Sequence, residues 1–189
     1  MGLDSVELVL TFEEVFQISI LNEEAEKMRT PRDVIDCMVA KLEAQVHGPA
    51  MVMMAREEAA WVQLRNALRT SAMVSEAATK EKKLEDVFAD RHARRRQWRQ
   101  LRQQLQAKAW PGLSWLGLGK DFPCQLRTLG DLSDWIARCN LQRLTEAERQ
   151  VLTRADIALL VKHITLQQTG LREEKYDENK HFVDDFGID

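Results

Sequence analysis

Proline and glycine are scarce in this sequence, with 4 and 8 residues among 189. Because these two residues interrupt helices, and Leu, Ala, Glu, Gln and Arg favour them, the composition predicts helices along nearly the whole chain. The three cysteines, Cys37, Cys124 and Cys139, are an odd number without paired spacing. They argue against a disulfide framework and favour reduced, partly buried thiols in a cytoplasmic protein.

Long apolar runs and the usual signatures of catalysis are also missing. No run approaches the roughly 18 apolar residues of a membrane span, and no basic-then-apolar segment opens the chain, so we expect neither membrane insertion nor export. The four histidines and three cysteines show no metal-ligand spacing. Neither a Ser/His/Asp order nor a Gly-rich phosphate loop appears. We therefore expect no catalytic residue, no metal site and no enzyme.

Charge is abundant but unevenly distributed. Hydrophobic content of 44% and charged content of 30% describe a folded chain, long enough for one domain or two small ones, with a net charge of −3. Residues 1–30 hold seven acids against two basic residues, whereas residues 80–108 hold ten basic residues against four acids. The second segment could be a solvated helix face, a nucleic-acid surface or a docking face for an acidic helix. The acidic whole chain and the lack of a stacking motif argue against nucleic acid.

The start of the chain carries the most specific pattern. Asp4-Ser5 precedes an acidic helix expected over residues 5–17, with Leu8, Phe12 and Val15 on one apolar face. A hydroxyl in the first turn of a helix faces unpaired backbone N–H groups and the positive end of the helix dipole, which together stabilise a phosphodiester. The simpler interpretation is that Ser5 is only an N-cap.

Two other helix starts are expected before residue 50. Thr30-Pro31-Arg32-Asp33 has the residues of a capping box with proline at the first helical position, and the helix should stop by His47-Gly48-Pro49. Asn22 is expected to cap a short helical turn. A longer helix is expected from about Arg56, and another, basic on its exposed side, over residues 91–108.

Parts of the chain recur at a nearly constant spacing. Arg29–Asp36 and Arg127–Asp134 share Arg, Thr, Asp, an aliphatic residue and Asp at an offset of 98 residues. Phe182–Phe186 matches Leu84–Phe88 at the same offset, and the helix around Leu160 matches that around Leu64 at 96. These matches predict an internal repeat of one helical unit.

The repeated unit resembles the acyl carrier protein family, small four-helix bundles whose serine, in an Asp-Ser-Leu motif at the start of the second helix, carries 4′-phosphopantetheine. Residues 152–171 look like the first helix, and residues 182–189, His181 preceding them, look like the acidic approach to the serine. Residues 2–20 look like the serine and second helix, with Val6 where Leu is usual, and residues 22–42 look like the third and fourth helices. The matches cover about half the chain, in a permuted order.

The resemblance implies an all-α fold of two carrier-like four-helix bundles. Residues 1–46 would supply helices two to four of the first bundle, which residues 150–189 complete, because the first segment alone is too short for a stable core. Residues 55–143 would form a degenerate second copy, in which Asp90-Arg91-His92 stands where the modified serine should be.

The resemblance also implies a function. Ser5 would carry 4′-phosphopantetheine, Asp4 would help a phosphopantetheinyl transferase recognise the site, and the acidic residues Glu7, Glu13 and Glu14 would dock enzyme partners. The protein would then hold acyl or aminoacyl thioesters for acyl-transferring or condensing enzymes of fatty acid or polyketide biosynthesis. An unmodified carrier-like adaptor is the alternative. The bundle could close within one chain, with Asp189 near Met1, or head-to-tail between chains.

Overall fold

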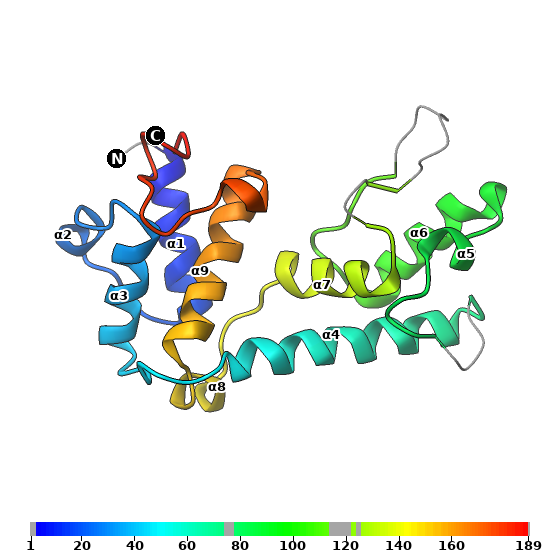
Figure 1. Ribbon diagram of the computed structural model, residues 1–189, viewed down its shortest axis with the longest axis horizontal. Helices are drawn as coiled ribbons and strands as arrows, with labels where there is room; N and C mark the ends of the chain where they lie inside the picture. Colours follow the sequence, from blue (N-terminus) through cyan, green and yellow to red (C-terminus); the bar gives the residue numbers. More distant parts are fainter. Residues whose placement is uncertain (1–2, 74–77, 114–121, 124–125, 189) are drawn as a thin grey trace. The chain divides into compact units, whose positions relative to one another are not determined.

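The computed structural model describes residues 3–73, 78–113, 122–123 and 126–188. Over these residues the fold is all-α, as predicted, without a strand (Figure 1). No described helix has the length and apolar character that crossing a membrane would require. Met1, Gly2, Cys124 and Asp189, on which sequence-based expectations rest, lie outside the described residues.

The chain divides into two compact units. Unit 1 comprises Met1–Met54 and Leu141–Asp189, and unit 2 comprises Ala55–Asn140. Unit 1 is therefore assembled from two segments that lie at opposite ends of the sequence, with unit 2 between them. Each unit has its own buried hydrophobic cluster.

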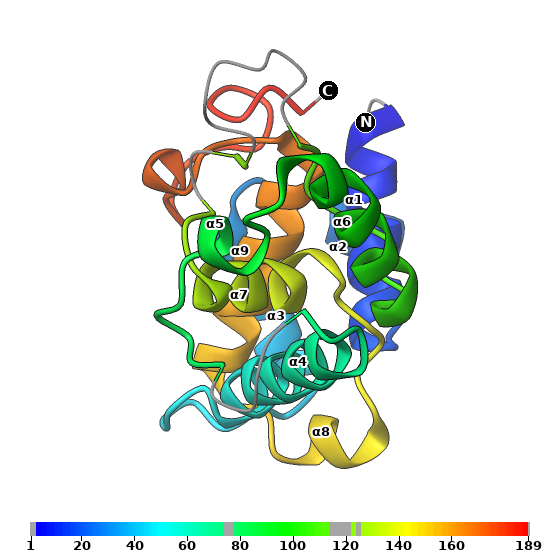
Figure 2. The same ribbon diagram turned by 90° about the vertical axis from the view of Figure 1, so that its right-hand side faces the viewer.

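Unit 1 is built on three long helices. They are α1 (Leu3–Phe16), α3 (Pro31–Lys41) and α9 (Arg154–Thr169). Helix α9 contacts both α1 and α3, as the two views in Figures 1 and 2 show. Two short helices, α2 (Asn22–Ala25) and α8 (Glu146–Gln150), and a 3₁₀ turn η1 (Glu173–Lys175) connect them. The core joins both ends of the sequence and includes Phe12, Phe16, Ile35, Leu160 and Phe182.

Unit 2 contains most of α4 (Met51–Thr70), together with α5 (Leu84–Val87), α6 (Arg91–Leu105) and α7 (Leu129–Cys139). Its core is richer in aromatic rings. Trp98 lies 4.9–5.4 Å, between ring centroids, from Phe88, Trp110 and Phe122, and its indole N–H donates to the Pro111 carbonyl at 2.8 Å. The indole is thus buried with its polar atom satisfied.

Threonine begins several of the helices in both units. Thr30 accepts the Asp33 N–H while the Asp33 carboxylate accepts the Thr30 N–H at 2.8 Å, and Thr128 and Asp131 do the same at the start of α7. Such reciprocal bonds satisfy N–H groups that the helix itself leaves unpaired. Further capping boxes start α8 and α9, at Thr145 and Thr153.

Backbone hydrogen bonds between distant segments also recur at the offset of 98. In unit 1 the Phe182 N–H donates to the Arg29 carbonyl and the Arg32 N–H to the Glu178 carbonyl, both at 2.9 Å. In unit 2 the corresponding bonds run from Leu84 to Arg127 at 2.9 Å and from Gly130 to Lys80 at 2.8 Å.

A third long-range backbone hydrogen bond of unit 2 has no counterpart in unit 1, because a proline stands at the donor position there. The Leu129 N–H donates to the Lys82 carbonyl at 2.9 Å. The residues at the corresponding offset are Pro31 and Lys180, and proline has no N–H to donate. The two units thus share a hydrogen-bonded frame that does not depend on most side chains.

Several helix bounds differ from those expected. Helix α1 begins two residues earlier, α4 begins at Met51 instead of about Arg56, and α6 ends at Leu105 instead of residue 108. Helix α3, by contrast, ends at Lys41 with Leu42 as its C-cap, in agreement with the expected stop by Gly48-Pro49. Leu21, not Asn22, is the N-cap of α2, where the Glu24 carboxylate accepts the Leu21 N–H at 2.8 Å. The side-chain capping expected of Asn22 is therefore wrong.

Candidate functional site

Ser5 lies inside the first turn of α1. Because the helix begins at Leu3, Ser5 is its third residue and not its N-cap, contrary to the simpler interpretation of the sequence. Asp4 precedes it in the same turn, where a carboxylate interacts favourably with the helix dipole. Asp4 is exposed and Ser5 is half-buried. An anion bound at Ser5 would therefore lie among first-turn N–H groups that have no partner within the helix.

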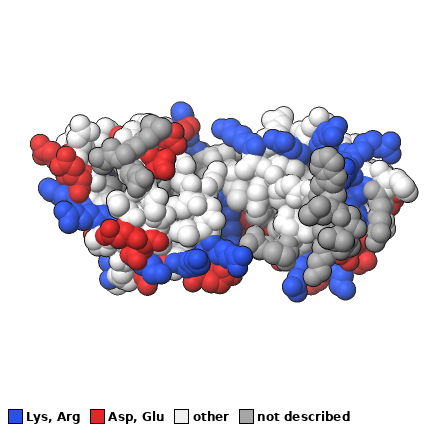
Figure 3. Space-filling view, turned by 90° about the horizontal axis from the view of Figure 1, so that it is seen from above, with Lys and Arg blue, Asp and Glu red and all other residues white. Residues whose placement is uncertain are grey.

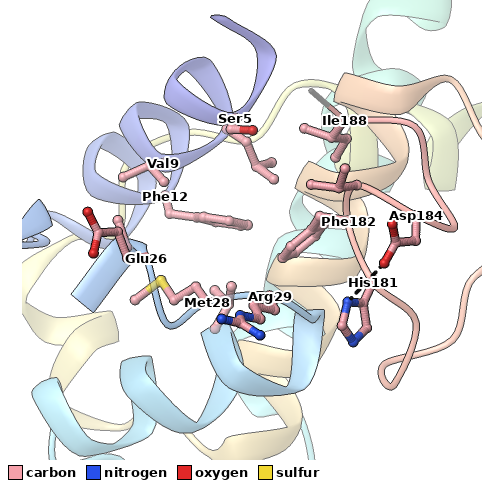
Figure 4. A pocket seen from close by; sticks show the side chains of 14 residues that line it. Ser5, Val9, Phe12, Glu26, Met28, Arg29, His181, Phe182, Asp184 and Ile188 are labelled. Carbon is pink, nitrogen blue, oxygen red and sulfur yellow. Dashed lines mark ion pairs between the residues drawn. The ribbon is translucent and has the colours of Figure 1, made fainter. Parts of the chain in front are cut away.

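An apolar cavity of about 360 Å³ opens beside Ser5. Figure 4 shows Ser5 and Val9 of α1 on one side and Phe182 and Ile188 of the C-terminal segment on the other, with Phe12 between them. Met28 lines it from the segment after α2. A volume of this size is at the lower end of the range for small-molecule sites.

The C-terminal segment forms this wall because it is tied to the rest of unit 1. Phe182, Phe186 and Ile188 are buried in the core. The Phe182 N–H donates a hydrogen bond to the Arg29 carbonyl, and the Ile188 N–H donates one to the Phe182 carbonyl, each at 2.9 Å. The two ends of the described chain consequently meet at the site, and Asp4 and Ile188 line a second, polar hollow of about 180 Å³.

The three acidic residues predicted to dock partners have different surroundings. Glu7 is exposed, and no ion pair of its carboxylate is found among the described residues. The half-buried Glu13 carboxylate accepts the Ile20 N–H at 2.7 Å and so stabilises the end of α1. Glu14 pairs with Arg143 at 3.2 Å, with both side chains more than half exposed. An exposed pair of this kind contributes little stability and can exchange partners.

Two exposed apolar residues on α1 were not predicted from the sequence as part of the site. Val6 is 39% and Leu10 55% exposed, and they are four residues apart on the helix beside Glu7. Their spacing of four residues was the available signal, but Leu8 and Phe12 on the buried side of α1 have the same spacing, so spacing alone does not distinguish the two sides. Together these residues give α1 an apolar and acidic outer surface.

The described residues include no group of three or more His, Cys, Asp or Glu side chains arranged to hold a metal ion. The His181 Nδ1 lies 3.4 Å from an Asp184 carboxylate oxygen at the edge of the cavity, with both side chains exposed (Figure 4). Cys37 and Cys139 are free and half-buried, and burial raises the pKa of both thiols. The site therefore presents a hydroxyl, carboxylates and an apolar cavity.

Comparison with known proteins shows partial similarity to a carrier protein. An acyl carrier protein from Thermosynechococcus vestitus (strain NIES-2133 / IAM M-273 / BP-1) is 50% identical to this chain over 43 residues, 23% of this chain and 53% of that protein. The chain thus spans about half the length of this curated relative. No protein-family model matches the chain. No solved structure matches it either. The similarity supports a relationship to carrier proteins.

Proposed function

We propose that unit 1 is an acyl carrier domain whose first helix, α9, comes last in the sequence. Its Ser5 would carry 4′-phosphopantetheine. The observation that carries the proposal is the position of Ser5, in the first turn of α1 and on the edge of an apolar cavity. The partial sequence identity to an acyl carrier protein supports the proposal that a phosphopantetheine arm is attached at this position.

The attachment reaction would use coenzyme A and a phosphopantetheinyl transferase. The Ser5 oxygen attacks the pantetheine-bearing phosphorus, the pyrophosphate bond breaks, the hydroxyl proton passes to a base of the transferase, and adenosine 3′,5′-bisphosphate leaves. Asp4, exposed beside Ser5, is placed to contribute to transferase recognition. The carrier itself contributes no catalytic residue.

The cavity provides an environment for part of an attached acyl chain. Its walls are mostly aliphatic and aromatic side chains, including Leu8, Phe12 and Phe182. Each methylene group moved from water into such surroundings is stabilised by about 0.8 kcal/mol. The proposed partners are acyl-transferring or condensing enzymes, which would approach the outer surface of α1 formed by Val6, Glu7 and Leu10.

Unit 2 is proposed to be a second carrier-like unit without an arm. At the start of α6 the Asp90 carboxylate accepts the His92 N–H at 2.9 Å and the Ala93 N–H at 3.3 Å. A carboxylate thus occupies the position at which a phosphodiester would be bound, and like charges repel. This unit should remain unmodified.

A test of the proposal measures the intact mass of the full chain after co-expression with a broad-specificity phosphopantetheinyl transferase. We expect the mass of one phosphopantetheinyl group to be added, with peptide fragmentation placing it on Ser5. Ser5→Ala should abolish the addition. Ser19→Ala, at an exposed serine beyond the end of α1, is the matched control and should retain it. An unchanged mass, or an arm on another residue, would refute Ser5 as the attachment site.

A second candidate is an adaptor that keeps the carrier fold without an arm. The exposed Val6 and Leu10 favour it, because an apolar and acidic helix surface can bind a partner whatever happens at Ser5. An unmodified chain that still binds a condensing or acyl-transferring enzyme, and loses that binding in Leu10→Glu, would support the adaptor. Light scattering at several concentrations in about 1 M salt, where contacts between exposed charges are screened, separates closure within one chain from head-to-tail exchange, since exchange still gives a mass that grows with concentration.

A further inference from the structure

The charged residues on the exposed side of helix α6 are all basic. Arg95, Arg96, Arg99 and Arg102, here called the basic face, are all exposed, and α6 contains no acidic residue between Arg91 and Leu105. Figure 3 shows Lys and Arg side chains gathered over unit 2 on the side visible there. The opposite side of α6 is buried in the aromatic core through Trp98 and Leu101.

This face is unfavourable for unit 2 itself. Arg95 and Arg99 are one turn apart, a spacing at which like charges destabilise a helix, and cations near its N-terminal end oppose the dipole. Arg95, Arg96 and Arg99 form no ion pair with any described residue. These like charges lower the stability of α6, and no ion pair with a described residue compensates for them. This indicates that the basic face serves a contact outside unit 2.

The chemistry of the face favours a protein over a nucleic acid. Binding of single-stranded nucleic acid uses aromatic side chains on which bases stack. The aromatic rings nearest the basic face are turned inward: Trp98 is 4% exposed and Phe88 is fully buried. What remains are exposed guanidinium groups, of which Arg95, Arg99 and Arg102 are spaced four and three residues apart along α6 and are suited to carboxylates presented by another helix.

A matching helix surface exists in this protein. Glu7 and Glu14 on α1 are exposed and seven residues apart, the same separation as Arg95 and Arg102. Seven residues are two helical turns, or about 10 Å, so two such helices lying side by side can pair their charges at both positions. Among the residues that the structure describes, the Glu14 carboxylate pairs with the exposed Arg143, and breaking this exposed pair costs little free energy.

We propose that the basic face of α6 is a docking surface for helix α1 of a second molecule of this protein. The contact uses exposed charges, so it is weak and salt-sensitive. It does not depend on modification of Ser5, and Ser5→Ala is expected to leave it unchanged. Failure of the arm and failure of this contact can therefore be told apart.

The test is sedimentation equilibrium of the full chain over a range of concentrations. At about 50 mM salt we expect a mass that rises with concentration, and an association about tenfold weaker at about 300 mM, because screening shortens the reach of exposed charges. Arg95→Glu, Arg96→Glu and Arg99→Glu together should abolish the association. Arg102 is retained in this variant because its guanidinium donates to the Ala107 and Lys108 carbonyls at the end of α6.

The control triple variant makes the same charge change elsewhere: Lys27→Glu, Arg172→Glu and Lys175→Glu, all exposed and in unit 1. It should still associate. Glu7→Lys with Glu14→Lys should abolish self-association as well. Mixing this variant with the α6 triple variant should restore a complex weaker than that of wild type, because the three introduced glutamates attract the two lysines while the retained Arg102 repels them.

Four results would overturn the proposal. The first is a wild-type chain that stays monomeric at every concentration and salt, and the second is an equal loss of association in the Lys27, Arg172 and Lys175 control variant. The third is the absence of a complex when the α1 and α6 variants are mixed. The fourth is a wild-type chain that binds a short RNA but does not self-associate, together with an α6 triple variant that loses the RNA binding. The last result would assign the face to nucleic acid instead.

Discussion

Units 1 and 2 share a backbone frame and differ in what fills it. The same two long-range hydrogen bonds and the same Thr–Asp capping box occur in both. In unit 1 the space beside α1 is an apolar cavity open at Ser5. In unit 2 the rings of Phe88, Trp98 and Phe122 pack together, and the Arg94 side chain lies over Phe122.

The surfaces of the two units differ as much as their interiors. The outer surface of α1 carries Val6, Glu7, Leu10 and Glu14, whereas that of α6 is a row of arginines. The two units therefore keep the same backbone bonds and caps while their side chains give each unit a different interior and a different surface. This is why the function is to be sought in the site and not in the fold.

The largest effect is expected from Asp156, which unit 2 does not reproduce. Its buried carboxylate accepts the Thr153 hydroxyl and the Met53 N–H, both at 2.9 Å, and Ala60 stands at the corresponding offset of 96. Asp156→Ala should destabilise unit 1 by about 3 kcal/mol, because buried donors lose a charged acceptor. Hydrogen exchange should show faster exchange in α9 and α3 with α6 and α7 unchanged. Asp36→Ala, at an exposed pair with Arg154, should cost less than about 1 kcal/mol.

Arg94→Ala tests the interior of unit 2 in the same way. The Arg94 Nε–H donates to the Phe88 carbonyl at 2.7 Å, and its guanidinium carbon lies 5.4 Å from the Phe122 ring centroid. Loss of both contacts should destabilise unit 2 by about 2 kcal/mol, seen in the fluorescence of the buried Trp98 during denaturant unfolding. Arg95→Ala, on the exposed side of the same helix, should change stability by no more than about 0.5 kcal/mol. Equal effects of the two variants would contradict a structural role for Arg94.

The capping boxes allow a matched comparison of the shared frame. Thr30→Ala and Thr128→Ala each remove the acceptor of an N3 amide, at 3.2 Å in both units. Each should destabilise its own unit by about 1 kcal/mol, measured as the local rise in hydrogen exchange of α3 or α7. Thr30→Ser and Thr128→Ser keep the hydroxyl and should restore most of the stability. A marked difference between the destabilisation caused by Thr30→Ala and that caused by Thr128→Ala would show that the two capping boxes do not contribute equally to their units.

The smallest effect is a difference in acid sensitivity. Lys41 donates to the Glu24 carboxylate at 2.8 Å and, with the Leu21 N–H, lowers the pKa of Glu24 below its usual 4.5. The stabilisation is present above the unfolded pKa and is lost as the pH falls below about 4.5 through the folded value. Lys41→Met should raise the pKa of Glu24 toward its ordinary value, measured by NMR titration. Unit 2 has Phe122 and Cys139 at these positions and should lack this dependence.

Rules that act within a few residues were read correctly from the sequence. Thr30, Pro31 and Asp33 form the predicted capping box, and the buried stripe of Leu8, Phe12 and Val15 lies where its spacing placed it. The start of α4 was predicted too late for a tertiary reason. The Met53 N–H in its first turn is satisfied by Asp156, 103 residues away, and no local residue signals this cap.

The sequence by itself determined the helical composition, the local caps and the opposite charges of residues 1–30 and 80–108, because each follows from neighbours along the chain. Only the tertiary structure decided that Glu13 serves the Ile20 backbone and that Val6 and Leu10 stay exposed. It also brought Phe182 and Ile188 beside Ser5 to close a cavity. The cavity depends on contacts across more than a hundred residues, which burial and backbone hydrogen bonding establish together and no local pattern encodes.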